Sequence, residues 1–206
     1  MSNKIGIINY GMGNLRSVEN SVKKLNFEVI TIKNPEEINK VDKLILPGVG
    51  SFKEAMKLLN RGGWVEKINV NVIQEKKPIF GICLGMHLFA SSGEEFGNTK
   101  GFNFIEGEVK NLKSVGCKNN VPQIGWNSIN KKKNHKFLHN IPENTDFYFV
   151  NSFVFQPKNL LNVIAETNYG VNFCSVIAKE NIFGTQFHPE KSSKAGNQIL
   201  KNFLDA

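Results

Sequence analysis

Two short motifs hold the residue types that nucleophilic catalysis needs. The first is Ile79-Phe-Gly-Ile-Cys83-Leu-Gly85, in which a glycine stands two positions before the cysteine and another two positions after it. An apolar run that enters a tight turn and then a helix predicts an elbow that exposes its central side chain as a nucleophile. The N-terminus of the following helix favours a thiolate over a thiol. The alternative is an inert core cysteine, because small cysteines in apolar runs are often simply buried.

The second motif is His188-Pro-Glu190, which follows the apolar segment 182–187. Pro189 is expected to hold the chain extended, so that side chains two positions apart point to the same side. Glu190 could then orient the imidazole while His188 faces the thiol, which is the arrangement that activates a nucleophile. A surface histidine beside a turn proline is the alternative, and the elbow around Cys83 favours the catalytic interpretation. We therefore predict a Cys-His-Glu triad.

Two glycine loops follow predicted strands nearer the N-terminus. Pro47-Gly-Val-Gly50 exposes backbone N–H groups that could stabilise an oxyanion, although a plain strand–helix connector fits the same residues. The loop 9–14 contains Gly11 and Gly13 and could suggest a dinucleotide site. The third glycine of that fingerprint is missing, and no acidic residue ends the next strand. A nucleotide site is therefore not favoured.

The elements that must position these residues alternate along the first half of the chain. Strands are expected at 4–8, 27–32, 43–46 and 79–82, and helices at 15–25, from 51 onward, at 64–75 and at 84–91. This alternation predicts a parallel sheet with helices on both faces, whose carboxyl edge binds ligands. Further strands are expected at 104–109, 122–129, 147–155, 162–165, 173–177 and 182–187, before a final helix at 194–204. We predict an α/β fold: one domain over 1–206 with a mostly parallel open sheet flanked by helices and an additional antiparallel or mixed strand region.

The composition of the 206 residues, 40% apolar and 21% charged, is typical of a globular protein in water. No signal peptide and no membrane-spanning run is apparent, and three widely spaced cysteines suggest free thiols in a reducing compartment. We expect a cytoplasmic protein with no membrane partner. The net charge of +8 comes from scattered lysines, so no nucleic-acid partner is expected. No metal-ligand spacing is present, and we expect neither a metal nor another cofactor.

These motifs together resemble those of a known family. Gly81-Ile-Cys-Leu-Gly85, Pro47-Gly-Val-Gly50 and Gln186-Phe-His-Pro-Glu190 are similar to the motifs of the class I glutamine amidotransferases. Asn9-Tyr-Gly-Met-Gly-Asn-Leu-Arg16, Ile124-Gly-Trp-Asn127 and the ending His188-Pro-Glu-Lys-Ser192 narrow the resemblance to the glutaminase subunits of imidazole glycerol phosphate synthase, from histidine biosynthesis. The resemblance extends from Ile5 to the last helix.

The resemblance implies that Cys83 attacks the side-chain amide of L-glutamine and that His188, held by Glu190, protonates the departing ammonia and later activates water. A glutamyl thioester would form and hydrolyse to glutamate. Backbone N–H groups would bind the oxyanion, and further residues would bind the substrate. The implied substrate-binding residues are Gly48, Val49, Gly50, Leu84, His87 and Glu95, the last at the amino acid end of glutamine.

A partner chain follows from the chemistry of ammonia. Ammonia is mostly protonated near neutral pH and is then not a nucleophile, so it must pass directly to an acceptor site. A 206-residue glutaminase domain has no room for that site. The resemblance implies a heterodimer with a (β/α)8-barrel cyclase, with the segment 10–14 as a candidate contact and the loop 48–50 as a candidate switch.

Four residues depart from the family pattern. His87 replaces a usual glutamine, Gln123 and Asn151 replace usual histidines, and Phe153 replaces a usual tyrosine. These departures leave two alternatives open. One is a paralogous glutaminase that supplies ammonia for amidation of a surface-polysaccharide sugar, and the other is a non-catalytic interaction protein that retains the fold.

Overall fold

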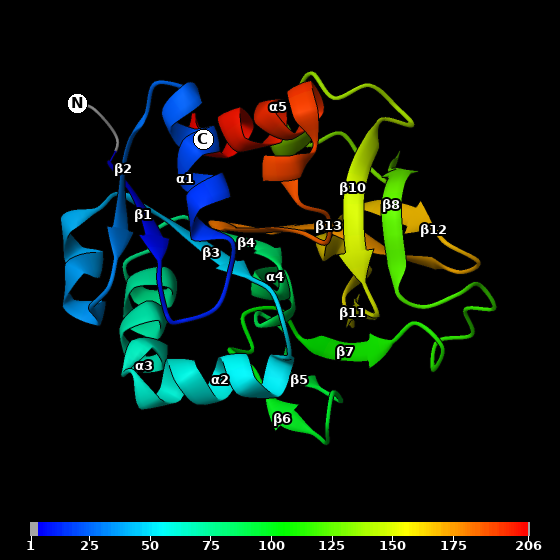
Figure 1. The fold of residues 1–206 in the computed structure, drawn as a ribbon, viewed down its shortest axis with the longest axis horizontal. Helices are drawn as coiled ribbons and strands as arrows, with labels where there is room; N and C mark the ends of the chain where they lie inside the picture. The colour runs from blue at the N-terminus through cyan, green and yellow to red at the C-terminus, as the bar shows by residue number, and fades with distance from the viewer. Residues whose placement is uncertain (1–3, 206) are drawn as a thin grey trace.

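A computed structural model describes residues 4–205, and an eight-stranded sheet forms its middle layer (Figure 1). The strands across the sheet are, in order, β2 (Glu28–Ile32), β1 (Lys4–Ile8), β3 (Lys43–Gly48), β4 (Ile79–Cys83), β14 (Ile182–Thr185), β13 (Asn172–Lys179), β12 (Val163–Asn168) and β9 (Asn130–Lys131). Strands β2 to β14 in this order pair in parallel, and the last three are antiparallel. The predicted α/β fold with a mostly parallel sheet is confirmed.

Helices cover both faces of this sheet, because apolar side chains on its strands alternate between two cores. Ile7 on β1 belongs to the core under α1 (Leu15–Lys24) and α5 (Ser193–Leu204), whereas the adjacent Ile8 belongs to the core under α2 (Phe52–Arg61) and α3 (Trp64–Asn69). Figure 1 shows α1 and α5 on one side of the sheet and α2 and α3 on the other. A π-helical turn, Val70–Gln74, continues α3 over most of the predicted range 64–75.

The helix expected at 84–91 is much shorter than predicted. α4 covers only Leu84–His87, and the next residues form tightening turns in which the Phe89 amide bonds three residues back, to the Met86 carbonyl. The Leu88 carbonyl accepts a hydrogen bond from the Phe102 amide. In a longer helix this carbonyl would accept from an amide four residues further along the same helix. Tertiary pairing therefore ends the helix after one turn.

The additional strands form two small sheets. One pairs β10 (Asp146–Asn151) with β8 (Gln123–Ser128), and the other contains β11 (Phe153–Pro157), β7 (Gly107–Asn111), β5 (Ser92–Gly93) and β6 (Thr99–Lys100). The single strand predicted at 147–155 was wrong, because the chain leaves one sheet at Asn151 and enters the other at Phe153. The strand predicted at 104–109 begins only at Gly107, since Phe104 and Ile105 are buried in irregular backbone.

The parallel strands deliver five chain segments to one edge of the sheet, which we call the carboxyl edge. Strands β2, β1, β3, β4 and β14 end there, at Ile32, Ile8, Gly48, Cys83 and Thr185. Loops that are far apart in sequence therefore meet at this edge. Within residues 4–205, no helix has the length and apolar character that a membrane crossing requires.

Candidate active site

Cys83 occupies a strained turn between β4 and α4. Its φ of 53° and ψ of −109° are rare for a residue with a side chain, and they point to a tightly constrained elbow. The flanking glycines make this turn feasible. A Cβ on Gly85 would lie 1.8 Å from the Leu46 carbonyl oxygen, and a Cβ on Gly81 would lie 2.6 Å from the Gly85 backbone. The glycines are therefore required by close packing of the turn against itself and against β3.

His188 follows β14 and is held by backbone contacts on both sides. Its amide donates to the Tyr148 carbonyl at 2.9 Å, and the Ser192 hydroxyl donates to its carbonyl at 2.6 Å. The imidazole Nδ1 lies 2.9 Å from Glu190 Oε1, and both side chains are almost fully buried. The predicted extended chain was wrong beyond His188, because Pro189–Lys191 forms a 3₁₀ turn. The turn nevertheless brings the carboxylate to the Nδ1 atom of the ring.

The charges around His188 favour its protonated form. Burial by itself would lower the pKa of His188, but its interactions with the Cys83 sulfur and with Glu190 outweigh burial and raise that pKa to about 10. The Glu190 carboxylate lies on one side of the imidazole and the Cys83 sulfur on the other, and a negative charge at either place favours the imidazolium. The site is therefore suited to a thiolate–imidazolium pair.

Two further groups contact the Cys83 sulfur. The thiol donates to the Val150 carbonyl at 3.8 Å, and the Gln186 side-chain amide donates to the sulfur at the same distance. Gln186 is fully buried and was not identified as a site residue from the sequence. The available signal was its place two residues before His188, at the end of β14, on the strand next to the one that carries Cys83.

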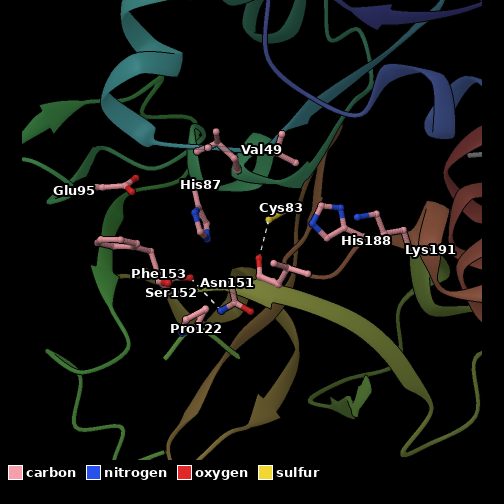
Figure 2. A pocket seen from close by; sticks show the side chains of 13 residues that line it. Val49, Cys83, His87, Glu95, Pro122, Asn151, Ser152, Phe153, His188 and Lys191 are labelled. Carbon is pink, nitrogen blue, oxygen red and sulfur yellow. Dashed lines mark hydrogen bonds between the residues drawn. The ribbon is translucent and has the colours of Figure 1, made fainter. Parts of the chain in front are cut away.

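A pocket of about 340 Å³ opens beside the sulfur (Figure 2). Figure 2 shows the His188 and His87 side chains on opposite sides of Cys83, with Glu95 at the far end beyond His87. The predicted site residues that line the pocket are Cys83, His188, Val49, Gly50, Leu84, His87 and Glu95. Two predicted residues do not line it: Gly48 pairs with Cys83 in the sheet, and Glu190 lies against the imidazole ring.

The polar side chains at the end of the pocket away from His188 are fixed in position by neighbouring elements. Glu95 Oε2 accepts from the Phe52 amide at 2.8 Å, at the first turn of α2, where the helix favours negative charge. His87 Nε2 lies 2.7 Å from Gln186 Oε1. Burial lowers the pKa of His87 to about 4, although its contact with Gln186 acts in the opposite direction. His87 is therefore neutral at physiological pH.

Sequence reasoning missed part of the pocket wall. The residues not predicted as site residues are Pro122, Val150, Asn151, Ser152, Phe153 and Lys191. Asn151 and Phe153 had been noted only as departures from the family pattern. Four of these residues come from β10, β11 and the residue between them, whose change of sheet could not be read from an uninterrupted apolar run. Among residues 4–205, no group of three or more His, Cys, Asp or Glu side chains could hold a metal ion.

The arrangement supports attack on a carbonyl carbon. A strained cysteine faces an imidazole that a carboxylate orients, and a cavity adjoins the sulfur. This combination fits covalent catalysis on an amide, in which the imidazolium supplies a proton to the departing nitrogen.

Comparison with known proteins identifies similar sequences and folds. The model of the family "Glutamine amidotransferase class-I" matches residues 6–206. The imidazole glycerol phosphate synthase subunit HisH 2 of Methanococcus maripaludis is 44% identical over 200 residues, covering 97% of this chain and 98% of that protein. The subunit HisH of Geobacter sulfurreducens is 42% identical, covering 97% of each chain. The subunit HisH 1 of Campylobacter jejuni (strain RM1221) is 45% identical, covering 97% of this chain and 98% of that protein.

Solved structures resemble the fold at lower sequence identity. A crystal structure described as a glutamine amidotransferase superimposes with a TM-score of 0.77 at 17% identity, covering 98% of this chain and 97% of that chain. A chain of the PurLQS structure from Thermotoga maritima gives a TM-score of 0.75 at 18% identity, covering 100% of this chain and 99% of that chain. At these identities the likeness concerns the fold alone.

Proposed function

Because this chain belongs to the class I glutamine amidotransferase family, we propose that it is the glutaminase subunit of imidazole glycerol phosphate synthase. In this role it hydrolyses L-glutamine to glutamate and ammonia and passes the ammonia to a partner subunit in histidine biosynthesis. The observation that carries this proposal is the strained Cys83 elbow, which adjoins the buried His188–Glu190 pair at the wall of the pocket.

The proposed reaction uses Cys83, His188 and Glu190 as a triad. The Cys83 thiolate attacks the side-chain carbonyl carbon of glutamine, and the negative charge moves to the carbonyl oxygen. When that intermediate collapses, the carbon–nitrogen bond breaks and the His188 imidazolium gives its proton to the leaving nitrogen, which departs as ammonia. Neutral His188 then removes a proton from water, whose oxygen attacks the thioester and releases glutamate and the thiolate. Glu190 keeps the ring oriented throughout.

The pocket supports the proposed binding roles of the remaining residues. The Leu84 amide and one amide of the loop 48–50 would bind the oxyanion, since both segments adjoin Cys83. The Glu95 carboxylate, which is fixed by the Phe52 amide, would bind the ammonium group of the substrate. His87 would form the wall between these two ends. No step in this scheme calls for a metal or an organic cofactor.

A partner subunit would complete the site. We propose a (β/α)8-barrel cyclase in a one-to-one heterodimer, because ammonia must reach an acceptor before water protonates it. Large apolar side chains are exposed on the outer face of β8 and β10, where Ile124 is 63% and Trp126 is 54% exposed. Val150 on the same face also lines the pocket, so a chain docked there would lie close to the released ammonia. The segment 10–14 remains a candidate for the same contact.

The proposal extends to domain organisation and location. The family model spans residues 6–206, and both cores share one sheet, which supports a single domain over 1–206. The three cysteines are free thiols in the structure, in keeping with a cytoplasmic protein. The departures at His87, Gln123 and Asn151 would suit the polysaccharide paralogue, but relatives 41–45% identical carry the name of the same synthase subunit, and that alternative is therefore not favoured.

The test is glutamate release from glutamine by the complete chain mixed with the barrel subunit of the same organism. We expect Cys83→Ala to reduce release by at least about 1,000-fold, because the nucleophile is lost. Glutamine should also slow alkylation of Cys83 in the wild-type chain. Equal release by both proteins would contradict the enzymatic role. Failure of the wild-type gene to rescue a histidine auxotroph, with glutaminase activity intact, would favour a different ammonia acceptor.

A further inference from the structure

We propose that His87 and Gln186 form a buried hydrogen-bond relay that stabilises the Cys83 thiolate, with His87 acting as the positioning residue for the Gln186 amide. The inference deepens the proposed function and rests on Cys83 as the nucleophile. His87, one of the departures from the family pattern, would then position the amide that contacts the nucleophile.

Two hydrogen bonds define the relay. The Gln186 side-chain nitrogen donates to the Cys83 sulfur at 3.8 Å, and the Gln186 side-chain oxygen lies 2.7 Å from His87 Nε2. Gln186 is fully buried and His87 is 5% exposed. Water does not compete for the hydrogen bonds of the buried Gln186 amide, and a hydrogen bond is electrostatically stronger in such an interior than in water.

The direction in which the Gln186 amide points decides its effect on the sulfur. An amide nitrogen aimed at the sulfur donates to a thiolate and stabilises it, whereas an amide oxygen aimed there would repel the same charge. Rotation of the amide by half a turn would exchange these two outcomes. A donor that holds the Gln186 oxygen away from the sulfur therefore decides whether the amide stabilises or repels the thiolate. His87 Nε2–H is that donor.

Histidine suits this position because it stays neutral. Burial lowers the pKa of His87 to about 4, so a single ring proton is present at physiological pH, and the Gln186 oxygen holds it on Nε2. A neutral donor fixes the amide without adding a second positive charge beside the imidazolium of His188. His87 thus acts through Gln186 and need not contact the sulfur.

Other groups facing Cys83 act on the same thiolate. His188 lies across the sulfur and favours the thiolate, with Glu190 behind it. The Val150 carbonyl accepts from the thiol and so favours the protonated form. The Tyr10 hydroxyl interacts electrostatically with the sulfur from the first loop. The relay is therefore one of several contributions, and its removal should weaken the stabilisation of the thiolate without abolishing it.

The experiment measures the alkylation rate of Cys83 by iodoacetamide against pH in the full chain, with mass spectrometry of the Cys83 peptide as readout. Gln186→Met keeps the length of the side chain and removes its amide. We expect the midpoint of the profile to rise by about one pH unit, because a hydrogen bond to the charged sulfur is lost. His87→Leu should raise the midpoint by a smaller amount, because it frees the amide to rotate.

Two further variants make the test specific. His87→Gln retains a donor toward Gln186 and should give the wild-type midpoint. Ser175 contacts Gln186 through its backbone carbonyl, and its own hydroxyl is buried without a hydrogen-bond partner, so Ser175→Ala should also leave the midpoint unchanged. Circular dichroism confirms the fold of each variant. If Gln186→Met does not fold, the difference between His87→Leu and His87→Gln decides the matter.

Wild-type midpoints in both Gln186→Met and His87→Leu would overturn the relay, as would an equal shift in His87→Leu and His87→Gln. These results are distinct from failure of the proposed function. If glutamine does not protect Cys83 of the wild-type chain from alkylation and no glutamate is released with the partner, the enzymatic role fails whatever the midpoints are.

Discussion

The polar side chains at the two ends of the parallel strands differ in how many of their atoms have hydrogen-bond partners. At the amino edge, where the strands begin, buried and half-buried side chains donate to helix and turn carbonyls, and among the nearby side chains Asn71 Oδ1 is buried without a hydrogen-bond partner. Lys43 at the start of β3 donates to the Phe203 and Leu204 carbonyls at 3.1 and 2.6 Å, and so caps the end of α5. Asn181, just before β14, donates to the Val72 and Lys77 carbonyls at 2.8 and 2.9 Å.

The carboxyl edge instead accumulates strain and unmatched groups. Cys83 has a positive φ. Several buried side-chain atoms at this edge and in the adjoining strands have no hydrogen-bond partner in the protein, namely Tyr10 Oη, Gln123 Oε1 and Nε2, Asn151 Oδ1 and Glu190 Oε2. Such groups cost stability when no substrate or water satisfies them. The contrast supports a division in which the amino edge stabilises the fold and the carboxyl edge holds the proposed active site.

Glu190→Gln should affect the carboxyl edge most strongly. We expect glutamate release with the partner to fall about 1,000-fold, because the amide no longer favours the imidazolium of His188. The wild-type rate should decline as pH rises through about 10, where His188 loses its proton, and the decline should begin at lower pH in the variant. A pH–rate profile of both proteins checks this, and an unchanged rate would remove Glu190 from the triad.

Gly85→Ala should break the carboxyl edge structurally. The added Cβ would lie 1.8 Å from the Leu46 carbonyl oxygen, so β3 and the elbow must separate. We expect a loss of about 3 kcal/mol in the free energy of unfolding, measured with urea, together with loss of glutaminase activity. Gly63→Ala is the control for an uncrowded site, because nothing lies within 4 Å of the added Cβ and only the positive φ of 71° opposes alanine there. A smaller loss at Gly85 than at Gly63 would contradict the tight elbow.

His87 should make the carboxyl edge sensitive to acid. Because its pKa is about 4 in the folded chain and 6.5 in the unfolded chain, the unfolded state binds more protons between these values. Stability should therefore fall as pH falls from 6.5 toward 4, by about 2 kcal/mol at pH 5 relative to pH 8. Urea unfolding of wild type and His87→Gln at both pH values checks this. An equal pH dependence in the two proteins would exclude His87 as the source.

Lys43→Met should affect the amino edge alone. Two carbonyls at the end of α5 lose their donor, and we expect a loss of about 1.5 kcal/mol in the free energy of unfolding. Glutamate release per folded molecule should not change, since Lys43 is at the opposite end of its strand from the site. Lys76→Met removes the exposed pair with Glu180 at the same edge and should cause no measurable change. A loss of activity in Lys43→Met would weaken the division between the edges.

Tyr10→Phe should change the free energy of unfolding less than Gly85→Ala and Lys43→Met do, and it should raise this free energy where they lower it. The Tyr10 hydroxyl is buried without a hydrogen-bond partner, so its removal should raise the free energy of unfolding by about 1 kcal/mol. Thermal or urea unfolding of the variant measures this. A destabilised variant would mean that the hydroxyl has a bound partner, such as a buried water.

Local sequence signals determined much of this molecule. The alternation of apolar runs and amphipathic segments up to Cys83 set the parallel sheet and its helices, because each pattern is a property of neighbouring residues. The glycines around Cys83 and the spacing of His188 and Glu190 predicted three side chains that the structure brings to one site, and these are the proposed nucleophile, base and orienting group. Even so, the reason given for the His188–Glu190 contact was wrong, since a 3₁₀ turn makes it.

Only the tertiary structure decided which groups surround the sulfur. The single turn of α4 ends because Phe102 takes the Leu88 carbonyl, and the sheet change between Asn151 and Phe153 creates one wall of the pocket. The contact between Gln186 and Cys83 likewise depends on the pairing of β14 beside β4. These features arise from contacts between distant segments, and no local pattern of residue types encodes which segments will meet.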